Sequence, residues 1–281
     1  MPNIDYEVEY NNRARVPEHP EIFARWAGEA ELYRADALKR GQADLGLSYG
    51  DTPRQYLDLF FPDAGPAAPL ALFIHGGWWR SLEPATFSQM ARGMNAHGVT
   101  VAVPGYDLCP NVGIGDIIEQ MRRACIFLWQ RLNRRIFACG HSAGGHLAAS
   151  LVATDWPTLY PKAPADLVTV GYAISGVFDL TTLVHITPNQ DLRLTEQTAR
   201  ELSPAFWQLP PGRIFDAVVG GLESSEFKRQ SQLLVQAWGK SAQTRYEEVA
   251  GQNHFTVIDA LADPHSAMTK RVAALAGGIK V

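Results

Sequence analysis

A serine stands between glycines in the stretch GHSAG, residues 140–144, directly after an apolar run and directly before an alanine-rich one. The pattern G-x-S-x-G is typical of a sharp turn between a strand and a helix that holds a nucleophilic serine clear of the sheet. Glycine and serine are common residues, so a plain turn is the competing interpretation. The expected strand before the turn and the expected helix after it favour Ser142 as a nucleophile.

A serine hydroxyl is a weak nucleophile and needs a base, which in turn is held by an acid. In chains with this turn the histidine comes last, and three histidines follow Ser142 by more than one helical turn: His185, His254 and His265. His254 lies in the stretch QNHFTVIDAL, after an expected strand and at a helix start, where a loop can hold an imidazole over the serine. We expect His254 to be the base; a surface histidine is the alternative interpretation.

Three carboxylates are candidates for the acid: Asp179, Asp216 and Glu223. Asp216 lies within an expected strand, and Asp179 is placed to cap the segment that follows it. Glu223 leaves a strand end one strand–helix step before His254, and chain order and position favour it over Asp179. A carboxylate at a helix N-terminus is also favourable through the helix dipole alone, so Asp179 stays open.

A second glycine stretch, HGGWW at residues 75–79, also follows an expected strand. Glycine lets backbone N–H groups approach a ligand closely, and such a loop supplies an oxyanion donor beside the residue after the nucleophile. The candidate donors are therefore the N–H groups of Gly77, Trp78 and Ala143. We expect His75 to tie this loop by hydrogen bonds rather than to take part in the reaction.

The elements that position these groups follow from the apolar pattern. Continuous apolar runs closed by glycine or proline predict buried strands, and apolar residues at helical spacing predict helices between them. Strands are expected over residues 55–61, 66–77, 99–106, 134–140, 167–176, 213–221 and 244–251, and helices over residues 21–42, 114–132, 227–238 and 265–276. This alternation predicts an α/β fold, with a mostly parallel central sheet and helices on both faces.

Residues 1–281 are expected to form a single domain. Residues 1–45 are interpreted as an N-terminal arm, and the helix within it as lying outside the core. Residues 180–212 are richer in threonine, proline and polar residues, and we expect them to form a small cap-like excursion. Such a segment would cover the carboxyl ends of the strands, where ligands bind in open α/β sheets.

Composition narrows the class of protein further. The chain has 281 residues, 46% of them hydrophobic and 19% charged, with a net charge of −4 and both signs scattered along it. This is ordinary globular composition without the basic surface of a nucleic-acid-binding protein. Neither a secretion signal nor a membrane-spanning run is expected. The three cysteines form no CxxC pair, so we expect reduced thiols and a cytoplasmic protein.

No cofactor or metal is expected. His141 and His146 flank the serine five residues apart, unlike the paired histidines of the HExxH motif. The oligomeric state is left open, a homodimer included.

Several motifs together resemble one family. The stretches HGGWW, GHSAGGHLAA, SGVFDL, GGLESSEFKRQS and NHF look like the α/β-hydrolase kind of kynurenine formamidase (arylformamidase) and its bacterial esterase relatives. The resemblance extends from about LGLSYGD to NHFTVIDAL, most of the chain. It implies an α/β-hydrolase fold with Ser142 as nucleophile, Glu223 as acid and His254 as base, and it favours Glu223 over Asp179.

The resemblance also has departures. Animal members commonly carry aspartate where this chain has Glu223, so the loop must absorb a longer side chain. They often carry tyrosine where this chain has Trp78.

The substrate that the resemblance implies is a small aromatic amide or ester, with N-formylkynurenine as the leading candidate. The residues that could contact such a substrate are Trp79, Tyr106, His141, Phe178, Phe206 and Trp207, although core packing is the alternative for the aromatic ones. A general short-chain carboxylesterase with the same triad is the nearest rival. A ligand-binding receptor that retains the fold and an acyltransferase are more distant ones.

Overall fold

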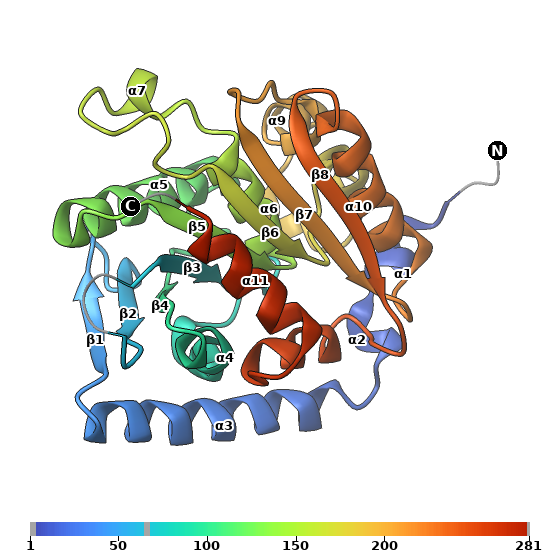
Figure 1. The fold of residues 1–281 in the computed structure, drawn as a ribbon. Coiled ribbons are helices and arrows are strands. Elements are labelled where there is room, and N and C mark those ends of the chain that lie inside the picture. The colour runs from blue at the N-terminus through green and yellow to red at the C-terminus, as the bar shows by residue number, and fades with distance from the viewer. Residues whose placement is uncertain (1–3, 65–67, 280–281) are drawn as a thin grey trace.

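The protein is described by a computed structural model that covers residues 4–64 and 68–279. Its centre is an eight-stranded sheet in the order β1-β2-β4-β3-β5-β6-β7-β8 (Figure 1). Strand β2 runs antiparallel to both of its neighbours, and the other neighbouring pairs are parallel. The strands are β1 (Ala43–Ser48), β2 (Tyr56–Phe60), β3 (Leu70–Ile74), β4 (Thr100–Pro104), β5 (Ile136–His141), β6 (Val170–Ile174), β7 (Arg213–Gly220) and β8 (Ala242–Val249).

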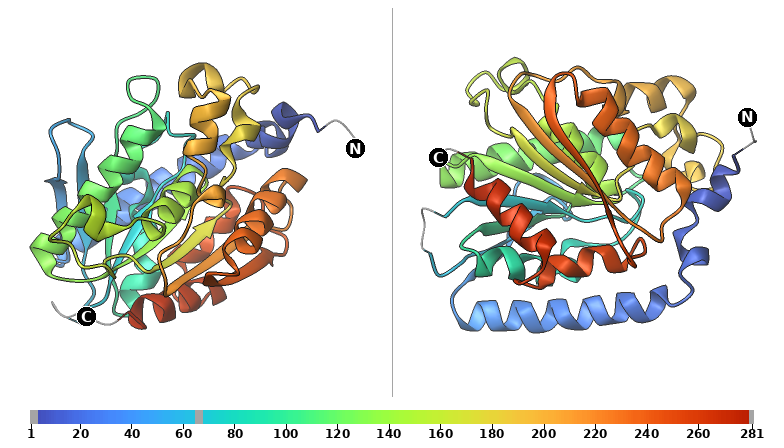
Figure 2. Two further views of the ribbon diagram at one scale, coloured as in Figure 1. Left: turned by 90° about the horizontal axis from the view of Figure 1, so that it is seen from above. Right: turned by 45° about the vertical axis from the view of Figure 1, so that its right-hand side comes forward.

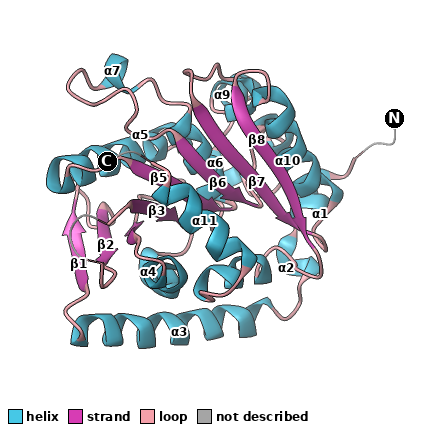
Figure 3. Cartoon of the chain, viewed as in Figure 1, coloured by secondary structure: helices cyan, strands magenta, loops and turns pink. Residues whose placement is uncertain are grey.

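Helices cover both faces of this sheet (Figures 2 and 3). The α-helices are α1 (Tyr6–Tyr10), α2 (Asn12–Arg15), α3 (His19–Lys39), α4 (Ala91–Ala96), α5 (Ile114–Leu132), α6 (Ala143–Val152), α7 (Trp156–Leu159), α8 (Asn189–Leu192), α9 (Glu196–Glu201), α10 (Ser225–Trp238) and α11 (Ala267–Gly277). The 3-10 helices are η1 (Pro84–Met90), η2 (Leu180–Leu183), η3 (Pro204–Phe206) and η4 (Thr256–Ala262). None of the helices in the described residues is both long and apolar enough to cross a membrane.

The two faces of the sheet hold two separate apolar cores. Successive side chains of a strand point to opposite faces, so in β3 Leu72 packs into the core beneath α5, α6 and α10, whereas Phe73 packs into the core on the side of α4 and α11. A strand buried on both faces must be apolar at every position. This explains why the inner strands appear in the sequence as continuous apolar runs.

The α/β fold expected from the sequence, with a mostly parallel sheet and helices on both faces, is confirmed, with one strand more than the seven expected. The additional strand, β1, lies at the edge of the sheet and alternates between half-buried and exposed positions. The placement of the first helix outside the core was wrong. Helix α3 buries Trp26 and Tyr33, whose rings lie 5.5 Å from Phe87 and 5.3 Å from Phe60.

Candidate active site

The turn around Ser142 joins β5 to α6. Ser142 has φ 54° and ψ −118°, a left-handed conformation that costs a non-glycine residue on the order of 1–3 kcal/mol. Hydrogen bonds hold it there, because its N–H donates to the carbonyl of Ile174 at 2.8 Å and its own carbonyl accepts from the N–H of Gly145 at 2.9 Å. The turn therefore raises the serine side chain above the carboxyl ends of the parallel strands.

The glycines of the motif are required by space. A Cβ at Gly140 would stand 2.0 Å from the carbonyl oxygen of Gly144, and a Cβ at Gly144 would stand 2.0 Å from that of Ile74. Both distances are much shorter than a van der Waals contact, and the backbone atoms involved cannot move aside. The sequence pattern is thus the consequence of packing a strand, a turn and a helix closely around Ser142.

Three side chains that are distant in the chain form a hydrogen-bonded row at this turn. The Nε2 atom of His254 lies 3.1 Å from the Oγ atom of Ser142, and its Nδ1 atom lies 2.6 Å from Oε2 of Glu223. All three residues are buried, Ser142 to 6% exposure, Glu223 to 8% and His254 to 4%. An imidazole placed between a hydroxyl and a carboxylate can take the hydroxyl proton through Nε2 while the carboxylate stabilises the resulting charge.

The second oxygen of Glu223 is held as firmly as the first. Oε1 accepts hydrogen bonds from the Oγ of Ser175 at 2.5 Å and from the N–H of Gly220 at 2.7 Å. Ser175 directly follows β6 and has φ 53°, which turns its hydroxyl toward the carboxylate. The longer side chain of glutamate, compared with aspartate, is in this way fixed in one orientation.

His141 contacts His254 and helps to hold it in this row. Its Nε2–H donates to the carbonyl oxygen of His254 at 2.8 Å, and the two rings lie 4.8 Å apart. Burial, with a smaller contribution from His254, holds the pKa of His141 well below its ordinary value. His141 is therefore neutral near pH 7, adds no positive charge beside His254, and leaves its Nδ1 as an acceptor.

The glycine loop after β3 faces Ser142. A Cβ at Gly76 would stand 3.0 Å from the Cβ of Ser142, so the two backbones lie as close as glycine allows. Gly77 and Trp78 follow with φ 110° and 57°, and Ala143 occupies the first position of α6, where an N–H has no acceptor within its own helix. The loop that carries Gly77 and Trp78 thus lies against the turn that carries Ser142 and Ala143. That the N–H groups of Gly77, Trp78 and Ala143 are oxyanion donors stays a prediction.

His75 anchors this loop from the core. Its ring is stacked between those of Phe87 and Tyr106, at 5.5 Å and 4.5 Å, and its Nδ1 lies 2.7 Å from the carbonyl oxygen of Gly76. Burial lowers the pKa of His75 to about 4, so the ring is neutral. This is the structural role that the sequence favoured for it.

A cleft of about 440 Å³ opens over Ser142. Three parts of the chain line its polar portion: residues 76–78 with Ser142 and His254, residues 186–188 of the excursion, and residues 10–13 of the N-terminal segment. An apolar wall is formed by Phe23, Trp26, Phe87 and Phe255. A cleft of this size with one aromatic wall can hold a single aryl ring and a short substituent.

Several aromatic residues expected at the substrate do not line this cleft. Trp79, Tyr106 and Phe178 are fully buried. Trp79 packs edge-on against the ring of His146 at 5.1 Å, and Tyr106 donates a hydrogen bond to the backbone of His75 at 3.0 Å. Their expected contact with substrate is thus corrected to core packing. Of the six residues expected at the substrate, only His141 lines the cleft.

The remaining candidates lie apart from the serine. The Asp179 carboxylate accepts from Thr181 and lies 3.6 Å from Arg229, so it is not the partner of His254. His185 is exposed and lies 3.4 Å from Glu196. The others are placed as follows: His265 is exposed, Asp216 pairs with Arg271, and Phe206 and Trp207 lie on η3 and directly after it, outside the cleft lining.

Two further parts of the site were not predicted from the sequence. The N-terminal segment was interpreted as an outlying arm, yet Tyr10, Asn12 and Arg13 line the cleft. The Ser-Gly pair at residues 175–176, directly after a buried strand at the carboxyl edge, was a signal that could have pointed to Ser175.

Comparisons with known proteins agree with this geometry. A family model described as "alpha/beta hydrolase fold" matches residues 71–209. Kynurenine formamidase of Danio rerio is 28% identical over 246 residues, which cover 84% of this chain and 83% of that protein. Kynurenine formamidase of Salmo salar is 29% identical, with 86% and 87% of the two chains covered.

A solved structure shows the same likeness over nearly the whole length. A protein from Silicibacter sp. TM1040, described as a candidate thioesterase, superposes with a TM-score of 0.85 at 32% identity. The match covers 96% of this chain and 99% of that one. These similarities confirm the resemblance that the sequence motifs indicated.

Proposed function

This chain belongs to the α/β-hydrolase family, and within that family we propose that it is a serine hydrolase of small aromatic amides or esters. The observation that carries the proposal is the row of Ser142, His254 and Glu223, with 3.1 Å between hydroxyl and imidazole and 2.6 Å between imidazole and carboxylate. A row of this kind is the arrangement that makes a serine hydroxyl nucleophilic.

The proposed reaction begins with attack of the Ser142 Oγ on the substrate carbonyl carbon. His254 Nε2 takes the hydroxyl proton and then donates it to the leaving nitrogen or oxygen. The acyl group is left on Ser142 as an ester. A water molecule, deprotonated by the same imidazole, attacks this ester, releases the acid and returns the proton to the serine.

The negative charge of each tetrahedral intermediate falls on the former carbonyl oxygen. The N–H of Ala143 and those of Gly77 and Trp78 are the proposed donors to that oxygen. Donors already fixed in place, next to the positive end of the α6 dipole, stabilise charge that develops only in the transition state. Glu223, held by Ser175 and Gly220, keeps the imidazole oriented throughout.

We favour an aryl formamide among these substrates, with N-formylkynurenine as the first to test. Two relatives that match over more than four fifths of this chain carry the name kynurenine formamidase. The aromatic wall of Phe23, Trp26, Phe87 and Phe255 suits an aryl group. Cleavage of such a substrate would release formate and an aromatic amine.

Ester or thioester hydrolysis is the second candidate. It is favoured by the 32% identity to the candidate thioesterase of Silicibacter sp. TM1040. The same row of residues would serve it, because only the leaving atom changes. The two candidates are therefore separated by substrate preference and not by mechanism.

The test is an assay of the purified protein with N-formylkynurenine, an aryl ester, an aryl thioester and an unformylated aryl amide. We expect the highest kcat/KM with the formamide. Ser142→Ala should lower every rate by at least about 10³-fold. Full activity in Ser142→Ala would overturn the mechanism, whereas turnover of the esters alone would overturn only the formamidase assignment.

A further inference from the structure

One polar side chain in the cleft has no partner. Asn12 is buried to 6% exposure and lines the cleft together with Ser142. Its side-chain amide makes no hydrogen bond with any residue that the structure describes. The amide nitrogen and oxygen are not among the fully enclosed polar atoms, so the small exposed part of Asn12 includes its amide. An unpaired amide that faces the cleft can form hydrogen bonds with a ligand bound beside Ser142.

The next residue adds a positive charge to the same wall. Arg13 lines the cleft, lies 6.0 Å from the centre of the Phe23 ring, and forms no ion pair within residues 4–64 and 68–279. The two carboxylates that line the cleft each have a partner other than Arg13. Glu7 accepts from the N–H of Thr187 at 2.6 Å, and Asp191 pairs with Arg80 at 2.6 Å. Arg13 is thus a cation of the cleft that is left for an anionic ligand.

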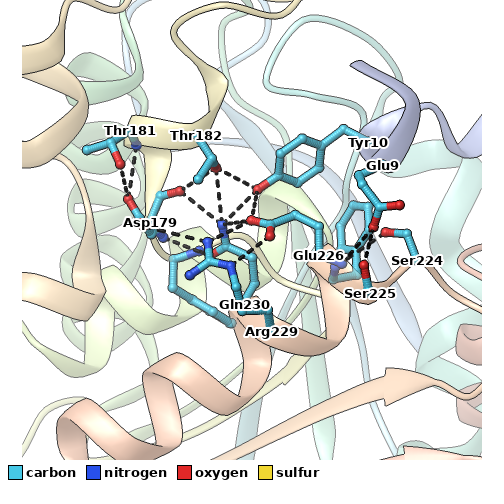
Figure 4. A network of polar contacts seen from close by, with 12 residues as sticks. Glu9, Tyr10, Asp179, Thr181, Thr182, Ser224, Ser225, Glu226, Arg229 and Gln230 are labelled. Atoms are coloured by element: carbon cyan, nitrogen blue, oxygen red, sulfur yellow. Dashed lines mark hydrogen bonds and ion pairs between the residues drawn. The ribbon is translucent and has the colours of Figure 1, made fainter. Parts of the chain in front are cut away.

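The segment that carries these two residues is firmly attached (Figure 4). Glu9 accepts hydrogen bonds from the Oγ of Ser225 at 2.6 Å and from the N–H of Glu226 at 3.0 Å. The hydroxyl of Tyr10 donates to Glu226 at 2.8 Å and accepts from Gln230 at 2.7 Å. Both anchors are on α10, so the chain enters α2 from a fixed point.

Local hydrogen bonds then set the direction of α2. The Oδ1 of Asn11 accepts from the N–H of Ala14 at 3.2 Å and caps the helix. Asn12 and Arg13 are the first two residues of that helix. The contacts of Glu9 and Tyr10 before them, and the hydrogen bond from Ala14 to Asn11, therefore fix the position of Asn12 and Arg13 at the cleft.

Building on the proposed hydrolysis at Ser142, we propose that Asn12 and Arg13 form a carboxylate-binding subsite, so that the preferred substrate carries a carboxylate on a side arm of its aryl group. The planar guanidinium matches a carboxylate with two parallel hydrogen bonds. The amide of Asn12 can donate a further hydrogen bond to the same group. Because Arg13 is exposed and Asn12 buried, the carboxylate would lie at the mouth of the cleft while the ring lies deeper.

The test uses two substrates that differ in charge alone. Both are aryl formamides whose ring carries a short acyl chain, which ends in a carboxylate in one and in a primary carboxamide in the other. The measured quantity is the ratio of the two kcat/KM values. We expect the wild-type protein to favour the carboxylate roughly tenfold to a hundredfold, as for a hydrogen bond to a charged group, and this ratio to fall as salt is raised.

Two variants and one control test the residues. Arg13→Gln should bring the ratio close to one, and Asn12→Ala should lower it several-fold. Arg40→Gln is the control for the loss of one positive charge, because Arg40 pairs with Asp36 at 2.9 Å and does not line the cleft. A wild-type ratio near one, or a ratio in Arg13→Gln equal to that of the control, would overturn the subsite.

A binding measurement separates this proposal from the hydrolysis itself. Calorimetry with Ser142→Ala would compare the two deformylated amines as ligands. We expect the carboxylate to bind at least about tenfold more tightly than the carboxamide, and Arg13→Gln in the same background to remove the difference. If the wild-type protein hydrolyses neither substrate, the proposed function fails, and the calorimetry still decides the subsite: equal affinities refute it.

Discussion

The two walls of the cleft are built in opposite ways. On the reaction side, formed by Ser142, His254 and Glu223, the polar side-chain atoms are paired with one another or with Ser175 and the backbone. On the N-terminal side, formed by Asn12 and Arg13, the side chains have no hydrogen-bond or ion-pair partner among the described residues. The side chains of the reaction side hold one another in a fixed geometry, which suits a reaction. The unpaired side chains of the N-terminal side can bind a substrate and so suit substrate selection.

The walls also differ in how the fold holds them. The reaction side lies at the ends of β5, β6 and β7 and after β8, at the carboxyl edge of the sheet. The N-terminal side is attached to α10 by Glu9 and Tyr10 (Figure 4). Substitutions should therefore act mainly on the rate of chemistry on the first side and on substrate choice and local stability on the second.

The largest effect is expected for His254. Replacing it by alanine removes the group proposed to move the proton, so kcat should fall by about 10⁴-fold or more for charged and neutral substrates alike. Steady-state kinetics with the carboxylate and carboxamide formamides measure this. If kcat fell much further for one substrate than for the other, the division between the two walls would be contradicted. A residue that only transfers the proton should affect both substrates equally.

Ser175 is expected to be next. Ser175→Ala removes one hydrogen bond to the carboxylate of Glu223, and a hydrogen bond to a charged group is worth about 1.5–3 kcal/mol, or roughly tenfold to a hundredfold in rate. The loss should fall on kcat and leave KM nearly constant, since Ser175 does not line the cleft. Glu223 would keep only the N–H of Gly220 at Oε1.

The matched control for this serine is Ser231→Ala. Ser231 is equally buried, in α10, and its hydroxyl has no partner within the described residues. It should keep the wild-type kcat. Equal losses in the two variants would mean that Ser175 acts only through packing, and a pH profile unchanged in Ser175→Ala would contradict its coupling to Glu223 and His254.

The strands inside the sheet could be predicted because both of their faces are buried, which makes each one a continuous apolar run. Strand β1 could not, since it lies at the edge, alternates in exposure and contains Gly46 at φ 69° where its register shifts. Helix α3 does carry a buried stripe at Ile22, Trp26, Ala30, Tyr33 and Ala37. Exposed leucines at positions 32 and 38 interrupt the apolar pattern that would mark this buried face. In addition, the spacing of apolar residues does not show which element they pack against.

The site divides in the same way. Chain order and position at strand ends favoured Ser142, Glu223 and His254, because the parallel sheet brings those ends together. They left Asp179 open as the acid, and the resemblance to a family then favoured Glu223. Aromatic residues such as Tyr106 and Phe178 lie near the same edge, yet sequence does not tell which way they point. The N-terminal side was missed because it depends on contacts such as that of Tyr10 with Glu226, which are 216 residues apart.

Buried neutral histidines make the stability of the reaction side depend on pH. Burial lowers the pKa of His146 to about 4, whereas the unfolded chain titrates near pH 6.5. Below about pH 6.5 the unfolded state binds the additional proton, so the free energy of unfolding should fall as the pH falls toward 4. The slope from His146 alone is at most about 1.4 kcal/mol per pH unit.

His146→Gln should reduce this slope by that amount while keeping a donor to the carbonyl of Leu202, which His146 meets at 2.8 Å. Urea unfolding at several values between pH 4 and 7 measures it. His185→Gln is the control, because the His185 side chain is 84% exposed and should leave the slope unchanged. The same slope in His146→Gln as in the wild type would show that His146 is protonated in the folded protein.

The smallest effect is expected on the N-terminal side, for Tyr10→Phe. The variant loses the hydroxyl that joins Glu226 and Gln230 but keeps the ring, which packs edge-on against Trp78 at 5.7 Å and Phe227 at 5.5 Å. We expect the free energy of unfolding in urea to fall by about 1 kcal/mol. The denaturant slope should not change, since the buried area stays the same.

Tyr6→Phe is the matched control for Tyr10→Phe, because Tyr6 stacks on Tyr10 at 6.2 Å and its hydroxyl makes no hydrogen bond with a described residue. If the hydrogen bonds of Tyr10 fix the N-terminal wall, Tyr10→Phe should also lower the preference for the carboxylate substrate over the carboxamide by about twofold to threefold. This corresponds to about 0.5 kcal/mol of binding energy lost through poorer positioning of Asn12 and Arg13. Tyr6→Phe should leave the preference unchanged. An unfolding free energy equal in both variants, with the preference intact, would mean that Asn12 and Arg13 are held at the cleft by α2 alone.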